Sequence, residues 1–123
     1  SSRSSEKRVR IPLVRMKVTR WASKEGLDPI EETSDDVQPS ESQMDVAKKL
    51  LGSGEARVSA GVDLAFKDFG DGYGVHVNVS LNCSQTDKGI GETLELAKEI
   101  SHSAAEMHME EAAALFEYMG KKK

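Results

Sequence analysis

The sequence predicts an α+β fold in which an antiparallel sheet of three or more strands is packed by a long C-terminal helix. Apolar and polar residues alternate along 56–85 around a glycine-rich turn, which is typical of a β-hairpin. An apolar stripe with helical spacing then runs along about 90–119, and a shorter alternating segment precedes both. With 123 residues, 37% of them apolar, the chain fits one small domain with a modest core.

The N-terminal segment 1–24 is strongly basic. It carries eight lysine and arginine side chains against one glutamate, whereas the rest of the chain carries nine basic and twenty acidic side chains. Within it, 11–21 alternate between apolar and basic or polar residues, which predicts a strand with a basic outer face. Residues 25–40 are acidic, hold two of the three prolines and show no periodicity, so we expect an acidic linker or extended arm before a domain over 41–123.

That domain is predicted to contain a short helix, the hairpin and the long helix. Ser40 and Gln43 have the spacing of a capping box, and Gly52 marks the end of the short helix. The hairpin places valine, leucine and aromatic residues on one face and polar residues on the other, around a turn over 68–72. The long helix carries an apolar stripe wider than one sheet requires, opposite a face rich in glutamate.

The long helix also predicts self-association. A helix of about 30 residues is ~45 Å long and a strand of about 11 residues is ~36 Å long, so the alanine-rich C-terminal half of the helix would overhang the sheet. We therefore expect a homo-oligomer in which this half packs against another chain; the alternative is that the helix at 41–51 covers the excess apolar surface. The predicted interface residues are Ala105, His108, Ala112, Leu115 and Met119.

Few residues suggest chemistry. Glu99 and His102 have the Glu-x-x-His spacing of a two-metal carboxylate site, but one copy on an acidic face favours a solvated surface. His108 lies one turn from Glu111 in the apolar stripe, where the two can pair at a helix–helix contact or remain partly exposed. Cys83 falls on the inward face of its strand, which indicates a core residue. Because no nucleophile lies beside a base, we expect no catalytic residue, metal, cofactor or small-molecule substrate, and no enzymatic activity.

The separation of charge supports two functional hypotheses. In the first, the basic segment contacts nucleic acid, with arginines on phosphates and one tryptophan stacked on a base, in a weak, sequence-tolerant and salt-sensitive complex. The residues would be Arg8, Arg10, Arg15, Lys17, Arg20 and Trp21. In the second, the chain is a structural protein, for example of a phage particle or another symmetric array, whose basic segment docks on the acidic surface of a neighbouring copy.

Location is predicted from what the sequence contains. It has one cysteine, no apolar run long enough for a membrane span and no apolar leader at its start. We therefore expect an intracellular protein, or one within a viral particle, that is neither secreted nor bound to a membrane.

Overall fold

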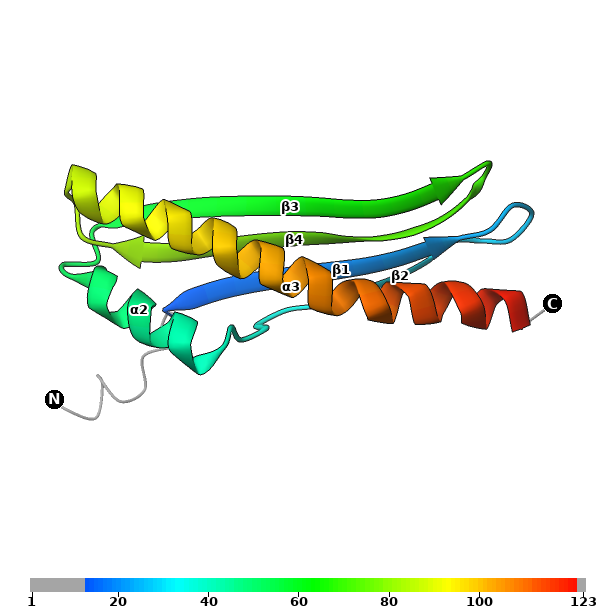
Figure 1. Ribbon diagram of the computed structural model, residues 1–123, viewed down its shortest axis with the longest axis horizontal. Coiled ribbons are helices and arrows are strands. Elements are labelled where there is room, and N and C mark those ends of the chain that lie inside the picture. The colour runs from blue at the N-terminus through cyan, green and yellow to red at the C-terminus, as the bar shows by residue number, and fades with distance from the viewer. Residues whose placement is uncertain (1–12, 122–123) are drawn as a thin grey trace, which may run out of the picture.

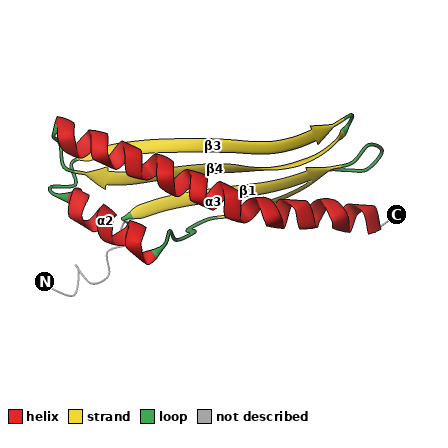
Figure 2. Ribbon diagram, viewed as in Figure 1, coloured by secondary structure: helices red, strands yellow, loops and turns green. Residues whose placement is uncertain are grey.

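The computed structural model describes residues 13–121 (Figure 1). The elements in chain order are β1 (Val14–Ser23), β2 (Ile30–Ser34), α2 (Glu41–Leu51), β3 (Ala56–Asp68), β4 (Asp71–Cys83) and α3 (Asp87–Lys121). The four strands form one antiparallel sheet in the order β2-β1-β4-β3, and both helices lie on the same face of it (Figure 2). The predicted α+β fold is confirmed, with four strands; residues 1–12 of the expected basic arm lie outside the described residues.

The hairpin of β3 and β4 forms as the alternation predicts. Val62 pairs with Val77 and faces the helices, while their neighbours Asp63 and His76 pair on the opposite face. The strands extend until Asp68 pairs with Asp71, so the connection is a tight two-residue turn rather than a loop over 68–72. Valines of β4 pack against those of β1 and form the centre of the core.

The short helix begins at the predicted cap. The Ser40 hydroxyl accepts a hydrogen bond from the Gln43 backbone N–H at 3.3 Å, and the Gln43 side-chain oxygen accepts one from the Ser40 N–H at 3.2 Å. These reciprocal bonds satisfy backbone donors that the first turn of a helix leaves unpaired. The helix ends at Gly52, which has φ +48°, and it buries Ala47 against the core.

The segment expected as a linker contains a strand. β2 pairs with β1 from Ala22↔Ile30 to Val18↔Ser34 and forms one edge of the sheet. Its sequence, Ile-Glu-Glu-Thr-Ser, shows no alternation, because this five-residue edge strand has three exposed and two partly exposed residues and buries few apolar side chains. Pairing with β1 therefore determines the conformation of β2, and the alternation of apolar and polar residues within five positions cannot predict such pairing.

The long helix rests on its own sheet along most of its length. Figure 1 shows α3 crossing the sheet obliquely, and it contacts β3, β4 and β1. α3 has 35 residues and is about 52 Å long, whereas β3 and β4 have 13 residues each and are about 43 Å long, so the helix still exceeds these strands in length. Because α3 crosses the sheet obliquely, its C-terminal half lies against β1 and the β1–β2 connection. Ala105, Ala112 and Met119 are consequently buried within the single chain. They are not available to another chain, which corrects the predicted interface; only His108 and Leu115 are partly exposed.

Candidate nucleic-acid interface on the open sheet face

The face of the sheet that points away from α2 and α3 is polar, and we call it the open sheet face. Strand alternation and register place four basic and two acidic side chains on it among neutral polar residues, and no described element covers it. Its side chains are Arg15, Lys17, Thr19, Trp21 and Ser23 of β1, Glu31 and Thr33 of β2, Arg57, Ser59, Asp63 and Lys67 of β3, and His76, Asn78, Ser80 and Asn82 of β4.

Three cations of this face lie together and form what we call the basic cluster: Arg15, Lys17 and Arg57. Arg15 and Lys17 are next but one to each other on β1, and both are exposed. Neither forms an ion pair with any residue of the described range. Arg57 crosses the sheet from β3, where its Nη2 donates to the Ser80 hydroxyl at 2.9 Å, and Ser80 is the register partner of Arg15. The cluster thus combines charges from both sides of β4.

Trp21 lies farther along β1, and its ring packs against Gly72 and Gly74 of β4. It is the register partner of Gly74, and a Cβ on Gly74 would lie 2.9 Å from two atoms of the indole ring. A Cβ on Gly72 would lie 3.4 Å from the ring's far end. Because neither glycine has a side chain, the indole can lie against the backbone of β4 and remain partly exposed. A shallow depression of about 280 Å³ next to the ring is lined by Trp21, Ser23, Lys67 and Gly72, among others.

A histidine–aspartate pair lies between the basic cluster and Trp21. His76 Nδ1 is hydrogen-bonded to the Asp63 carboxylate, and both side chains are exposed. This bond occupies Nδ1, so Nε2 is the ring nitrogen that a ligand can reach. His76 Nε2 therefore offers one hydrogen-bond donor or acceptor at the centre of the open sheet face.

Arg20 does not belong to this face, which corrects its assignment as a nucleic-acid contact. It shares the phase of Val14, Met16 and Val18, so its side chain points toward α3 and is only 8% exposed. Its Nη2 donates to Ser34 Oγ at 2.8 Å, and its Nη1 donates to His108 Nδ1 at 3.2 Å. Its Nε lies 3.2 Å from Glu111 Oε2 and 3.8 Å from Glu32 Oε1, as ion pairs without a hydrogen bond.

The predicted pairing of His108 with Glu111 is confirmed, but its location differs from the expected helix–helix contact. His108 Nδ1 lies 3.1 Å from Glu111 Oε2, and the pair faces β1 of the same chain. One ring nitrogen cannot accept from Arg20 and donate to Glu111 at the same time, so the tautomer selects one of the two bonds. His108 and Glu111 thus connect α3 to Arg20 of β1, which is in turn bonded to Ser34 of β2.

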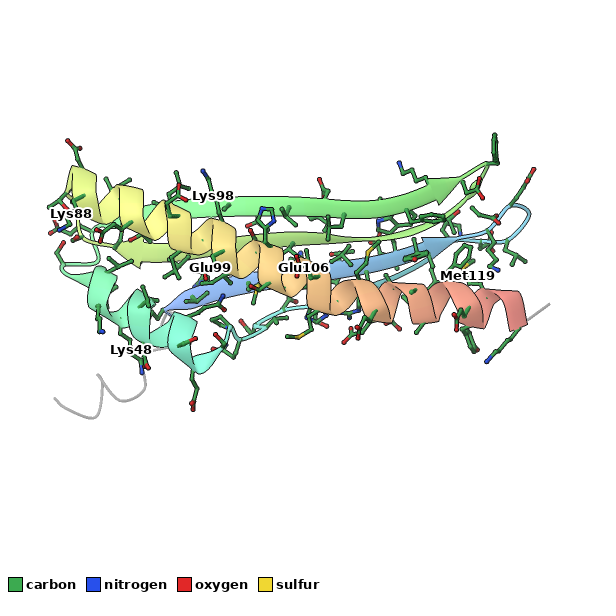
Figure 3. The ribbon with its side chains drawn as sticks, in the orientation of Figure 1. Lys48, Lys88, Lys98, Glu99, Glu106 and Met119 are labelled. Atoms are coloured by element: carbon green, nitrogen blue, oxygen red, sulfur yellow. The ribbon has the colours of Figure 1, made fainter. Side chains whose placement is uncertain are left out.

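The remaining predicted residues lie away from the open sheet face or outside the described residues. Arg8 and Arg10 lie outside the described residues. Glu99 and His102 are exposed on the outer side of α3, where Figure 3 labels Glu99 and Glu106. Across residues 13–121, no group of three or more His, Cys, Asp or Glu side chains is placed to hold a metal ion. Cys83 is a free, buried thiol, as expected.

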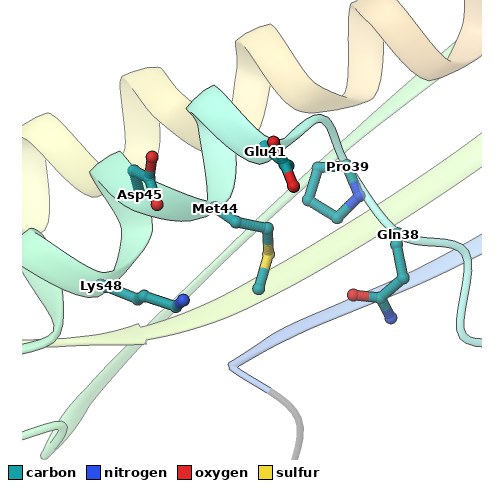
Figure 4. A pocket seen from close by; sticks show the side chains of 6 residues that line it. All are labelled: Gln38, Pro39, Glu41, Met44, Asp45 and Lys48. Atoms are coloured by element: carbon teal, nitrogen blue, oxygen red, sulfur yellow. The ribbon is translucent and has the colours of Figure 1, made fainter.

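A second hollow lies on the outside of α2 and is unrelated to the open sheet face. It has a volume of about 460 Å³ and is lined by Gln38, Pro39, Glu41, Met44, Asp45 and Lys48 (Figure 4). Its charged groups, Glu41, Asp45 and Lys48, are exposed side chains of α2. None of the described helices has the combined length and apolarity needed to cross a bilayer.

Sequence analysis identified only the β1 part of this face. Arg57 is one of the polar residues on the outer face of the predicted hairpin, but the order β2-β1-β4-β3, which brings it next to Arg15 and Lys17, is not evident from the local sequence. The spacing of Gly72 and Gly74 could have indicated the place of Trp21, since residues two apart lie on one face of a strand and two glycines leave room there for a large ring.

No family model, curated protein or solved structure matches this chain.

Proposed function

We propose that the chain binds single-stranded nucleic acid on its open sheet face. The observation that carries the proposal is that Arg15, Lys17 and a partly exposed tryptophan lie on the uncovered face of one strand, β1, and that Arg57 joins the two cations from β3. Arginine and lysine neutralise phosphates, and an aromatic ring supports an unpaired base by stacking. Lys17 and Trp21 are four residues apart, about 13 Å along the strand, so one short strand of nucleic acid can contact both.

The shape of the face favours a single strand over a duplex. A four-stranded sheet is too wide for a groove of a duplex, whereas a single strand can lay its bases on a sheet surface. Asn78, Asn82 and Ser59 offer hydrogen bonds that adapt to different bases, so binding would be sequence-tolerant. On the other side of the molecule, six exposed glutamates of α3 form an acidic helix face that repels phosphate: Glu92, Glu95, Glu99, Glu106, Glu110 and Glu117.

The test is titration of labelled single-stranded and duplex oligonucleotides at low salt, measured by fluorescence anisotropy. Replacing Arg15, Lys17 and Arg57 together by glutamine should weaken single-strand binding by roughly tenfold or more, because three phosphate contacts are removed. Trp21 is the only tryptophan, so its emission should be quenched when the oligonucleotide binds.

The matched control replaces Lys48, Lys88 and Lys98 by glutamine. These exposed lysines lie on α2 and α3 (Figure 3), and their removal changes the net charge by the same amount. Binding should remain within about twofold of wild type, because they are remote from the open sheet face. Equal losses in the two triple variants, or no binding by the wild type, would refute the proposal.

A second function, as an assembly protein, is favoured by one observation: the open sheet face and the acidic helix face lie on opposite sides of the molecule and have opposite charge. The first face of one copy can therefore dock on the second face of the next, which gives an open, head-to-tail array. Light scattering distinguishes the two functions. Growth of large particles without oligonucleotide, abolished in the Arg15/Lys17/Arg57 variant, would favour assembly.

A further inference from the structure

The aromatic residues of this chain are concentrated at one end of the molecule. Six aromatic side chains occur in the sequence, and all of them lie near the β3–β4 turn or the C-terminal end of α3. Phe66 stacks on Tyr73 with ring centroids 5.7 Å apart, and Tyr73 contacts Phe116 at 5.4 Å. Lys24 Nζ lies 4.2 Å above the Phe116 ring. We call this end, seen at the right of Figure 1, the aromatic end.

Phe69 is the most unusual residue of the aromatic end. It occupies the first position of the two-residue turn, with φ +45°, and Gly70 follows with φ +87°. A turn with two positive φ angles favours Asn-Gly or Asp-Gly, because bulky side chains strain the left-handed region. The Phe69 side chain is 97% exposed, so no contact within the chain compensates for this strain. Phe69 thus strains the turn and buries no surface within its own chain. Such a residue is expected where the aromatic ring anchors a contact with a second protein chain.

The same end also contains an apolar socket. A hollow of about 390 Å³ lies between the β1–β2 connection and the last turns of α3 and is lined by Leu27, Asp28, Pro29, Ile30 and Met119. Figure 3 labels Met119 at this end of the helix. The volume exceeds the ~150 Å³ of an apolar cavity that accommodates benzene, so an aromatic ring fits. The β1–β2 connection is joined to the hairpin turn by the Glu25 N–H, which donates to Asp71 Oδ1 at 2.9 Å.

We propose that two copies of the chain meet through their aromatic ends, each placing Phe69 in the socket of the other. A protruding ring and an apolar socket on one end of the same chain are the two halves of a self-complementary, two-fold contact. The charges around them also favour a second copy. Lys24 and Lys121 lie among Glu25, Asp28, Asp68 and Asp71, so opposite charges can meet, which two acidic helix faces cannot do. This dimer is closed and uses residues outside the open sheet face.

The contact is tested by replacing Phe69 with asparagine. Asparagine suits the turn better than phenylalanine, so the variant should fold and have an unfolding midpoint at least as high as that of the wild type. Sedimentation over a roughly hundredfold range of concentration should show a monomer–dimer equilibrium for the wild type, weakened by about tenfold or more in Phe69→Asn. Met107→Gln, which removes another exposed apolar side chain, is the control and should dimerise as the wild type does.

A mixing experiment distinguishes exchange of Phe69 from simple stacking of two Phe69 rings. Ile30→Glu closes the socket and keeps Phe69, and Phe69→Asn keeps the socket. A dimer of Phe69→Asn has two sockets and no Phe69 ring, and a dimer of Ile30→Glu has two Phe69 rings and no open socket. In a mixed dimer, Phe69 of the Ile30→Glu copy can enter the socket of the Phe69→Asn copy, so one of the two contacts is restored. The mixture should therefore associate more tightly than either variant by itself.

A monomeric wild type, or a Phe69→Asn variant that dimerises unchanged, would overturn the proposal. Failure of the mixture to associate would overturn the exchange of Phe69. These measurements contain no oligonucleotide, so their failure leaves the proposed function untouched.

Discussion

Arg20 illustrates how a single residue links three elements of this fold. Strand alternation places it on the inward phase of β1, and two carboxylates balance its charge: Glu32 of β2 and Glu111 of α3. Its terminal nitrogens are hydrogen-bonded to Ser34 of β2 and His108 of α3. A buried guanidinium is costly unless such partners are present. Arg20 therefore connects α3 and the edge strand β2 to β1, a role that a count of basic residues does not reveal.

Removing a partner of Arg20 should cost more than the exposure of that partner suggests. Glu111 is 55% exposed, yet Glu111→Ala leaves the buried guanidinium without its nearest carboxylate. We expect a loss of about 1–2 kcal/mol in the free energy of unfolding, discounted for the solvent around Glu111. Glu110→Ala, at the neighbouring exposed position, should change it by no more than about 0.5 kcal/mol. Urea denaturation of the two variants measures the difference, and equal values would contradict the assigned role.

Two glycines with opposite surroundings give a second comparison. A Cβ on Gly74 would lie 2.5 Å from the Leu64 carbonyl oxygen and 2.9 Å from the Trp21 ring, whereas a Cβ on Gly91 in α3 meets nothing within 4 Å. Gly74→Ala should destabilise the protein by about 3 kcal/mol and shift the Trp21 emission. Gly91→Ala should stabilise it by about 0.5–1 kcal/mol, because alanine favours a helix. Thermal unfolding and tryptophan fluorescence test both; an unperturbed Trp21 in Gly74→Ala would show that its ring does not rest on this glycine.

At the scale of elements, the sequence predicts those helices and strands whose side chains alternate or recur with a regular period, or whose caps are local. The hairpin alternates over 13 residues in each strand, and the α2 cap is local, so both follow from nearby residues. β2 was missed because its pairing with β1 is long-range and its five residues bury little. The sequence does not show that α3 crosses the sheet obliquely, so it could not predict that the C-terminal half of the helix packs against its own β1. Its wide apolar stripe is used mostly within the chain.

The corrected packing of α3 changes what a charge at Ala112 does. This residue is fully buried against its own sheet, so Ala112→Glu places a carboxylate without a partner in the core of the monomer. We expect a loss of about 3 kcal/mol or more, seen as a lower denaturation midpoint by circular dichroism. Ala114→Glu, the same substitution at an exposed position of the same helix, should be nearly neutral. A folded, fully stable Ala112→Glu variant would contradict the observed burial.

At the scale of the whole molecule, the fold separates charge by face more clearly than the sequence does. Of the basic residues in 13–24, Arg15 and Lys17 reach the open sheet face, Arg20 is buried, and Lys24 lies on Phe116. Arg57 joins the first two from a distant part of the chain. The sequence therefore predicts that a basic surface exists, but only the strand order determines which cations share it.

Salt dependence tests this arrangement quantitatively. A protein that neutralises a given number of phosphates on a single strand shows a slope of log K against log salt of about −0.7 per contact, so the basic cluster should contribute about −2. The Arg15/Lys17/Arg57 glutamine variant should lose that contribution, and the Lys48/Lys88/Lys98 variant should retain it. A slope that persists in the first variant measures contacts from cations outside the basic cluster, such as Lys67 or those of residues 1–12. Arg8→Gln with Arg10→Gln should reduce it by a further ~1.4 if both contact phosphate. A wild-type slope near zero would show that binding does not depend on phosphate, because counterion release must accompany every such contact.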